Sequence, residues 1–198
     1  RAEVLPAGGT AIIKHKTSAA APFAGGFVVE GRAALARFAS LHPYQLEAKA
    51  EVIIEHFRRD TKHKIGGRAK AMIVTKSRLH AVRYKQAFDA YLSEAGLNYR
   101  AVVAFSGTVI DNGQEYTEAS MNGFPEKQTV HEFAKPENKF LIVASKYQTG
   151  FDQPLLACMY VDKKLGGVNA VQTLSRLNRS HKDKEETFVL DFVNETDD

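Results

Sequence analysis

The segment Ala71-Met-Ile-Val-Thr-Lys-Ser-Arg78 decides the fold that we expect for this chain. Its first four residues form a short, continuous apolar run, which is typical of a strand buried on both faces of a sheet. A polar turn follows, and from there apolar residues recur at helical spacing as far as Gly96. The sequence therefore predicts a strand, a turn and a helix in that order.

Further apolar runs repeat this signal downstream. They are Ala101–Phe105, Phe140–Ala144, Ala157–Val161 and Phe188–Phe192. Upstream, helical spacing between Leu46 and Phe57 predicts a helix that begins after His42-Pro43. Buried strands that alternate with helices indicate an α/β fold, with a mostly parallel sheet flanked by helices and ligands bound beyond the carboxyl ends of the strands. We therefore expect the functional residues in the loops that follow strands.

Two segments depart from this alternation. Residues 106–138 are a polar insertion, in which a short helix is expected from Pro125 to Ala134. Residues 1–31 are mostly Ala, Gly, Pro, Thr and Ser, and we interpret them as a linker or a partly ordered lead-in. The main domain is therefore expected to span residues 32–198.

The composition fits one globular domain, because 44% of the 198 residues are hydrophobic and 25% are charged. A net charge of +4 is compatible with nucleic acid as a partner but does not require it. Cys158 is the only cysteine, which excludes a thiolate zinc site or a disulfide within the chain and indicates a reducing cytoplasm. The histidines lack metal-ligand spacing, and no apolar stretch has the length of a membrane span.

The segment Gln172-Thr-Leu-Ser-Arg-Leu-Asn-Arg179 carries the strongest chemical signal. Its amide and two guanidinium groups are offset by four and seven residues, which at about 100° per residue places them on one face of a helix. Two arginines held side by side can grip phosphate oxygens and cannot lose their charge. The segment predicts a phosphate-reading helix, with a solvated helix face as the alternative.

Three segments resemble motifs of superfamily 2 helicases and occur in the right order. Ala71–Arg78 resembles motif IV, Leu141–Pro154 resembles motif V, and Gln172–Arg179 resembles motif VI, Q-x-x-x-R-x-x-R. The long block from Val161 to Arg179 is similar to the second RecA-like motor domain of the R subunit of type I restriction enzymes. This resemblance covers about residues 31–198.

Motif V of this chain departs from the usual pattern. Thr149 stands before Gly150 where helicases carry Arg, and the segment that starts at Ala144 is one residue shorter. The role that the resemblance gives to Ser145 is therefore less firmly aligned than that of Asp152.

The resemblance implies a nucleotide site shared by two RecA-like lobes, of which the first supplies the P-loop lysine and the Mg²⁺ carboxylates. The second lobe supplies catalytic arginines that meet the β- and γ-phosphates, here Arg176 and Arg179. Asp152 would accept hydrogen bonds from the ribose or from these arginines, with a simple turn residue as the alternative. The implied nucleotide-binding residues are Gly150, Asp152, Gln172, Arg176 and Arg179.

The resemblance also implies contacts to DNA backbone phosphates, which carry no sequence information. The residues expected to make them are Thr75, Ser77, Arg78, Ser106 and Ser145. Ser77 has N-capping of the following helix as an alternative that is compatible with the contact. Arg83, Lys85 and the pair Lys163-Lys164 are considered as an added electrostatic track, against the alternative of solvated surface charge.

The function that follows is the second lobe of an ATP-dependent double-stranded DNA translocase. Its implied partners are DNA, the first lobe, and the methylation and specificity subunits. The complete protein would use ATP and Mg²⁺, the Mg²⁺ being held by the first lobe. Residues 1–198 contain no Walker motif and no nuclease constellation, so alone they are expected to bind no cofactor and to be inactive.

Two readings from other classes remain. One is a RecA-like module that binds DNA or a protein without motor activity. The other is a small-molecule nucleotide enzyme of doubly wound fold, which the lack of a Gly-rich loop after the first strand disfavours.

Overall fold

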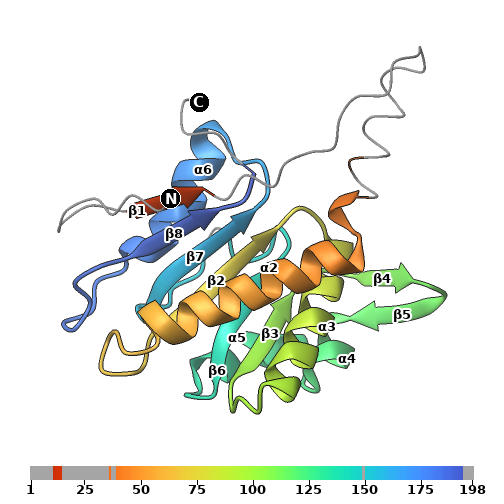
Figure 1. The fold of residues 1–198 in the computed structure, drawn as a ribbon, viewed down its shortest axis with the longest axis horizontal. Coiled ribbons are helices and arrows are strands. Elements are labelled where there is room, and N and C mark those ends of the chain that lie inside the picture. Colours follow the sequence, from red (N-terminus) through yellow and green to blue (C-terminus); the bar gives the residue numbers. More distant parts are fainter. Residues whose placement is uncertain (1–10, 15–35, 37–38, 149, 194–198) are drawn as a thin grey trace.

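A computed structural model describes residues 11–14, 36, 39–148 and 150–193. A six-stranded sheet lies at its centre, in the order β1-β8-β7-β2-β6-β3, and every neighbouring pair of strands is parallel (Figure 1). The strands are β1 (Ala11–Lys14), β2 (Lys70–Thr75), β3 (Arg100–Ala104), β6 (Asn138–Val143), β7 (Leu156–Asp162) and β8 (Phe188–Asp191). The predicted mostly parallel α/β fold is confirmed, and the five strands from β2 onward are those that the apolar runs predict.

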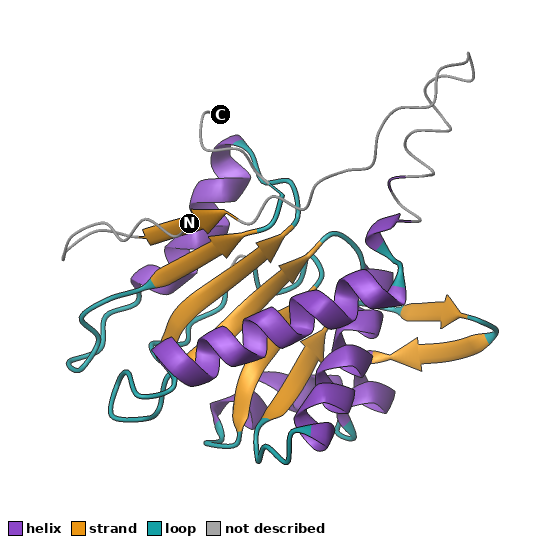
Figure 2. Ribbon diagram, viewed as in Figure 1, coloured by secondary structure: helices purple, strands orange, loops and turns teal. Residues whose placement is uncertain are grey.

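Helices cover both faces of this sheet. Outside the insertion of residues 106–138, the helices with described bounds are α2 (Pro43–His56), which continues into the π-helical turn η1 (Phe57–Thr61), α3 (Arg78–Glu94), α6 (Gly167–Leu174) and the 3-10 turn η3 (Ser175–Asn178). Figure 2 shows α2 and α3 crossing one face of the sheet. None of the helices in the described ranges has both the length and the apolar composition that a membrane crossing requires.

Helix α2 follows directly from its sequence. Pro43 occupies its first turn, where a missing N–H costs nothing. Leu46, Ala50 and Ile53 recur at helical spacing and are 0–1% exposed. The predicted helix is confirmed, and its buried stripe packs on the sheet.

Each central strand contributes to two hydrophobic cores. In β2, Ala71 and Ile73 join the cluster formed with α2 and α3, whereas Met72 and Val74 join the cluster on the opposite face with Phe133 of the insertion. Side chains of successive strand residues point to opposite faces. Because both faces are covered, the strand reads as a continuous apolar run rather than an alternating one.

Strands β2, β6 and β3 end level with one another. Val143 of β6 is in register with Val74 of β2 on one side and with Ala104 of β3 on the other. The loops after these three neighbouring strands therefore begin at the same edge of the sheet.

The insertion has more regular structure than the sequence predicted. It comprises the hairpin β4 (Thr108–Asp111) and β5 (Gln114–Thr117), helix α4 (Glu118–Asn122), the 3-10 turn η2 (Glu126–Gln128) and helix α5 (Thr129–Ala134). The predicted helix from Pro125 to Ala134 is realised as η2 and α5. The hairpin and α4 were missed, although Asn112-Gly113, with φ of +50° and +80°, is a standard turn signal for a hairpin.

Asn122 fastens the insertion to β3, the last strand of the sheet. Its side chain accepts a hydrogen bond from Val103 N at 2.9 Å and donates one to Val103 O at 2.7 Å. An edge strand leaves such backbone groups without a neighbouring strand. The amide of Asn122 takes the place of that neighbour.

Candidate functional site

The loop after β2 is held by its own polar side chains. Thr75 is 1% exposed, and its hydroxyl donates to Val143 O at 3.0 Å. Ser77 caps α3 by accepting from His80 N at 3.3 Å, as the capping alternative predicts. Arg78 is exposed and donates from Nη1 to Ser106 O at 3.0 Å. The buried hydroxyl of Thr75 thus links the end of β2 to β6 inside the domain, while Ser77 and Arg78 lie at the surface.

A hollow of about 420 Å³ lies where the three level strands end. We call it the carboxyl-edge hollow, and it is lined by Ser77, Arg78, Ser106, Ala144, Ser145 and Lys146. Four of the five residues expected to contact DNA therefore meet in one place, although they come from three separate segments. Thr75 lies outside the lining, with its hydroxyl turned to β6.

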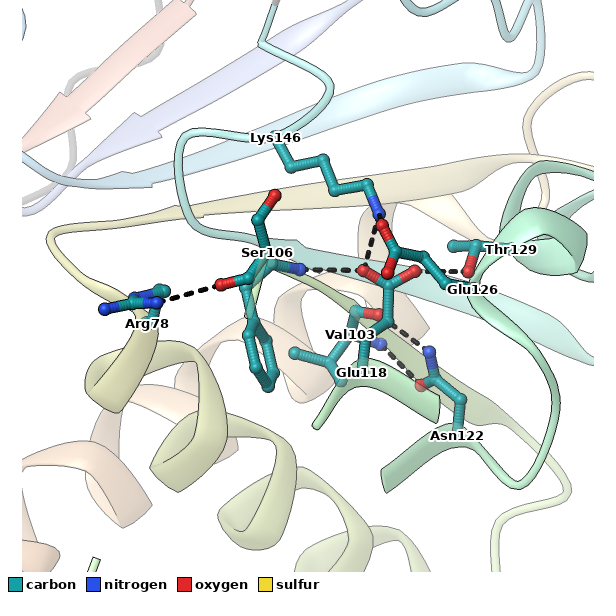
Figure 3. A network of polar contacts seen from close by, with 9 residues as sticks. Arg78, Val103, Ser106, Glu118, Asn122, Glu126, Thr129 and Lys146 are labelled. Carbon is teal, nitrogen blue, oxygen red and sulfur yellow. Dashed lines mark hydrogen bonds and ion pairs between the residues drawn. The ribbon is translucent and has the colours of Figure 1, made fainter. Parts of the chain in front are cut away.

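A buried carboxylate braces this hollow from behind (Figure 3). Glu118 is 2% exposed and accepts hydrogen bonds from Phe105 N, Lys146 Nζ and the Thr129 hydroxyl. Phe105 immediately precedes Ser106, so one carboxylate fixes the end of β3 and the loop after β6 together. No sequence pattern indicates this residue, because its partners lie 11 to 28 positions away.

The loop after β6 has an unusual backbone. Ser145 and Tyr147 have φ of +60° and +61°, in the left-handed region that residues other than glycine rarely adopt. The ring of Tyr147 packs against that of Phe151 at 5.1 Å between centroids, and Lys146 is tied to Glu118. Such conformations cost about 1–3 kcal/mol each and persist where the surroundings enforce them, commonly at functional sites.

The arginine segment, Gln172–Arg179, does not form the single helix face that its spacing predicts. Helix α6 ends at Leu174, η3 follows with tighter turns, and Arg179 has extended backbone with ψ of 123°. The Ser175 hydroxyl donates to Gln172 O at 2.8 Å, and Leu177 is buried against the sheet. These two contacts end the α-helix early, so the prediction of one shared face is wrong.

The two arginines nevertheless reach adjacent residues of the motif V loop. Arg176 donates to Phe151 O at 3.1 Å and to its own segment at Gln172 O at 3.2 Å. Arg179 forms an ion pair with Asp152 at 3.3 Å, and both side chains are well exposed, at 46% and 67%. Arg179 is thus one of the hydrogen-bond partners that the resemblance implies for Asp152.

Gly150 and Gln172 complete the residues expected at the nucleotide. Gly150 has φ of +68° with open space around its Cα, so the backbone conformation, rather than a close approach, favours glycine. Gln172 lies exposed on α6. Thr149 lies outside the described residues.

Arg83 and Lys85, which were considered for an added electrostatic track, are each paired with a carboxylate. Arg83 makes a two-pronged ion pair with Asp111, at 2.7 and 2.8 Å, which raises the pKa of the arginine. Lys85 is only 7% exposed and pairs with Asp89. Both cations are already neutralised by nearby carboxylates. Of the other pair, Lys164 is exposed after β7.

A second buried polar cluster joins helices α2 and α3 to the end of β7. Asp162 is 1% exposed and accepts from Lys49 Nζ at 2.8 Å and from the Tyr84 hydroxyl at 2.7 Å. Burial, together with Asp162, raises the pKa of Tyr84 well above its ordinary value. Because its members are covered and satisfied, the cluster stabilises the fold rather than binding a ligand. Sequence reasoning missed it.

Comparison with known proteins identifies the family of this chain. The family described as type I restriction enzyme subunit R domain 3 matches residues 109–194. An endonuclease subunit named for the type I restriction enzyme MjaVIIP of Methanocaldococcus jannaschii is 34% identical over 167 residues, which cover 77% of this chain. The chain belongs to the HsdR-like R subunits of type I restriction enzymes.

Two further proteins carry the same family name. The type I restriction enzyme HindI endonuclease subunit of Haemophilus influenzae is 38% identical to the HsdR-like domain over 74 residues, 34% of this chain and 7% of that protein. A fragment of an HsdR subunit from Vibrio vulnificus YJ016 shares the fold, with a TM-score of 0.56 at 17% identity over 80% of this chain and 28% of that one.

The HsdR-like domain spans about 15% of the length of the MjaVIIP subunit. Within the described ranges, no group of three or more His, Cys, Asp or Glu side chains is placed to hold a metal ion.

Proposed function

We propose that this domain is the second lobe of an ATP-driven double-stranded DNA translocase within a type I restriction R subunit. The carboxyl-edge hollow carries the proposal. Its surface groups are three serine hydroxyls and the Arg78 guanidinium, all exposed and all at the carboxyl ends of neighbouring parallel strands. Hydroxyl and guanidinium groups are typical ligands of backbone phosphates, and they read no base sequence. A motor that moves along any DNA requires contacts of this kind.

The arginine segment suits the phosphates of a nucleotide held between this lobe and another. A guanidinium has five N–H donors. Arg179 shares its charge with one exposed carboxylate and keeps donors free to meet an anion, whereas Arg176 already uses donors on Phe151 O and Gln172 O. ATP would supply the phosphoryl group that is transferred to water. Arg179 would neutralise charge on its phosphates, and Arg176 would hold the motif V loop beside it.

Mg²⁺ and the P-loop would come from the first lobe, as the resemblance to RecA-like motors implies. The whole-protein assembly also belongs to the proposal: double-stranded DNA, the first lobe, and the methylation and specificity subunits. The relatives that support it are named endonuclease subunits of type I restriction enzymes. The cytoplasm is the compartment that this assembly would occupy.

The test is DNA binding by the full-length R subunit at a series of salt concentrations. Replacing Arg78 by Ala removes one phosphate contact, so affinity should fall about tenfold for every sequence and the salt slope should decrease by about one. The matched control is Arg100→Ala, which removes an exposed arginine at the opposite end of β3. Equal effects of the two substitutions, or a loss confined to one DNA sequence, would reject the DNA contact.

The second candidate is a RecA-like module that binds DNA or protein without motor activity. The exposure of Asp152 and Arg179 keeps it open, because an exposed ion pair does not by itself require a nucleotide. DNA-stimulated ATP turnover by the full-length subunit separates the two candidates. DNA binding without turnover would favour the module.

A further inference from the structure

Lys146 is a charged residue of the carboxyl-edge hollow to which the motif comparison assigns no role. It follows Ser145 in the loop after β6 and lines the hollow together with Ser77, Arg78 and Ser106. In Figure 3, Arg78 and the Lys146 ammonium flank Ser106 from opposite sides. Lys146 is therefore a second cationic side chain in the lining of the hollow, beside Arg78.

Two carboxylates of the insertion hold the Lys146 ammonium, and they differ in their surroundings. Glu118 lies at 2.9 Å and is 2% exposed, whereas Glu126 lies at 2.5 Å and is 55% exposed. Burial acts to lower the pKa of Lys146, but its hydrogen bonds to Glu126 and Glu118 outweigh this and raise the pKa above its ordinary value. Lys146 is therefore a cation at neutral pH.

Glu118 cannot leave Lys146 without disturbing the fold. Its carboxylate also accepts the Phe105 N–H and the Thr129 hydroxyl, so its departure would leave buried donors without acceptors. Glu126 has no such constraint. It begins the 3-10 turn η2 at the surface, and an exposed ion pair of this kind contributes little to stability.

The backbone around Lys146 points to a ligand site rather than to a structural ion pair alone. The left-handed residues Ser145 and Tyr147 flank it on both sides. A surface ion pair could be formed from an unstrained loop. Strain of this kind is commonly retained where a site must be held ready before its ligand arrives.

From these contacts, and resting on the proposed DNA contact, we infer that Lys146 is a further DNA phosphate ligand whose charge Glu126 masks until a backbone phosphate displaces that carboxylate. Glu118 stays in place and acts as the positioning residue, because it ties Lys146 to the end of β3. An ammonium has three donors, so Lys146 can keep Glu118 while it binds phosphate. A DNA phosphate thus takes the place of the exposed Glu126 carboxylate beside Lys146, and the DNA releases the counterion that neutralised this phosphate.

The inference is tested by a double-mutant cycle in the full-length R subunit, with binding of a non-specific DNA duplex measured across salt concentrations. Lys146→Ala should weaken binding about five- to tenfold and lower the salt slope by about one. Glu126→Gln removes the masking carboxylate and should tighten binding about threefold. In the Lys146→Ala background Glu126→Gln should have almost no effect, because there is no cation left to unmask.

Glu186→Gln is the matched control. Glu186 is 60% exposed and forms an ion pair with Lys64 at 3.2 Å, and its substitution changes the net charge by the same amount as Glu126→Gln. Glu186 precedes β8 and Lys64 precedes β2, so the pair lies at the edge of the sheet opposite the hollow. Glu186→Gln should change DNA affinity by the same small factor whether or not Lys146 is present. If Glu126→Gln behaves in the same way, Glu126 does not mask Lys146 and the inference is wrong.

Removing Lys146 alone could unfold the domain, because it leaves the Glu118 charge buried without a partner. The double substitution Glu118→Gln with Lys146→Met removes both charges and keeps an acceptor for Phe105 N. It should retain a normal melting temperature and still show the reduced salt slope. A normal slope in this folded variant would overturn the inference.

Arg78→Ala separates this inference from the proposed function. If Arg78→Ala lowers affinity and slope while Lys146→Ala changes neither, Lys146 is not a phosphate ligand and the DNA contact of the hollow stands. If neither substitution has an effect, both the inference and the proposed DNA contact are rejected.

Discussion

The carboxyl-edge hollow and the arginine segment are both expected to meet phosphates, yet their charged groups are held in different ways. Behind the hollow, Glu118 is 2% exposed and binds three partners from three segments. In the arginine segment, Arg179 and Asp152 are 46% and 67% exposed and share one ion pair. The hollow is therefore shaped by the domain's own core, whereas the arginine segment leaves its ion pair facing outward.

Under the proposed function, this difference indicates which of the two surfaces is complete within one lobe. A groove for DNA backbone can be built by a single domain, and preformed geometry reduces the ordering cost of binding. Groups that must meet a nucleotide carried by another lobe have to remain exposed until that lobe closes. Substitutions behind the hollow should therefore change stability, and substitutions at Arg179 should change turnover.

The largest effect is expected for ATP turnover. Arg179→Ala in the full-length subunit should reduce DNA-stimulated hydrolysis about 10³-fold, because charge in the transition state loses its partner. Arg179→Lys should restore little, since a flexible point charge does not reproduce the planar fork. Combined with Arg176→Ala the loss should be less than additive. Steady-state ATPase assays measure each variant.

Unfolding measurements show whether these losses arise at the nucleotide. Arg179→Ala should change the free energy of unfolding by less than about 0.5 kcal/mol, while Arg176→Ala should cost about 1 kcal/mol because Phe151 O loses its donor. Near-normal turnover in Arg179→Ala, or a melting temperature low enough to explain the loss, would leave the arginine segment a structural element.

The second effect concerns stability behind the hollow. Glu118→Ala should lower the free energy of unfolding of residues 1–198 by about 4 kcal/mol, because Phe105 N and the Lys146 ammonium lose a buried partner. The measurement is urea unfolding followed by circular dichroism. Glu115→Ala, an exposed carboxylate of β5, is the control and should change it by less than about 0.5 kcal/mol. A cost equal to that control would show that the brace contributes nothing.

The third expected effect is a pH dependence of the free energy of unfolding, caused by His80, which contacts Ser77 of the hollow. His80 is 4% exposed, contacts the hydroxyls of Ser77 and Ser40, and burial lowers its pKa to about 4. In the unfolded chain His80 has the ordinary pKa of about 6.5. As the pH falls from about 6.5 to about 4, the unfolded chain therefore binds a proton at His80 while the buried imidazole of the folded domain stays neutral. Stability present above about pH 6.5 should decrease by about 2–3 kcal/mol across this window.

The comparison that isolates this contribution is between His80→Gln and His63→Gln. Urea unfolding at a series of pH values should show a shallower dependence for His80→Gln than for wild type. His63 is exposed, and its substitution should leave the dependence unchanged. Identical profiles for both variants would exclude His80 as the source.

The smallest effect is expected at the exposed ion pair of the arginine segment. A double-mutant cycle with Asp152→Ala and Arg179→Ala should give a coupling energy below about 0.5 kcal/mol in the unfolding of residues 1–198. A coupling above about 1 kcal/mol would remove the contrast between the two regions, because the arginine segment would then also be fixed within the domain.

The sequence alone predicted the parallel sheet, its main helices and the loops in which the candidate residues lie. Buried strands between helices produce continuous apolar runs, and α2 and α3 carry their apolar residues at helical spacing, so each element leaves a signal within its own few residues. The order of the strands along the chain then placed Ser77, Ser106 and Ser145 after strand ends. The turn sequence Asn112-Gly113 is also a local signal, typical of a hairpin, although the prediction did not include the hairpin β4–β5.

Which of these residues meet, and which cations are paired with carboxylates, depends on the folded arrangement of the whole domain. Glu118 and Lys146, Asn122 and Val103, and Arg83 and Asp111 are 28, 19 and 28 positions apart, and no local periodicity connects them. The end of α6 at Leu174 was equally hidden, because the burial of Leu177 and the hydrogen bond of Ser175 outweigh the helical spacing of the arginines. Local patterns record the burial of each element. The pairing of charges depends on where the folded chain brings distant side chains together.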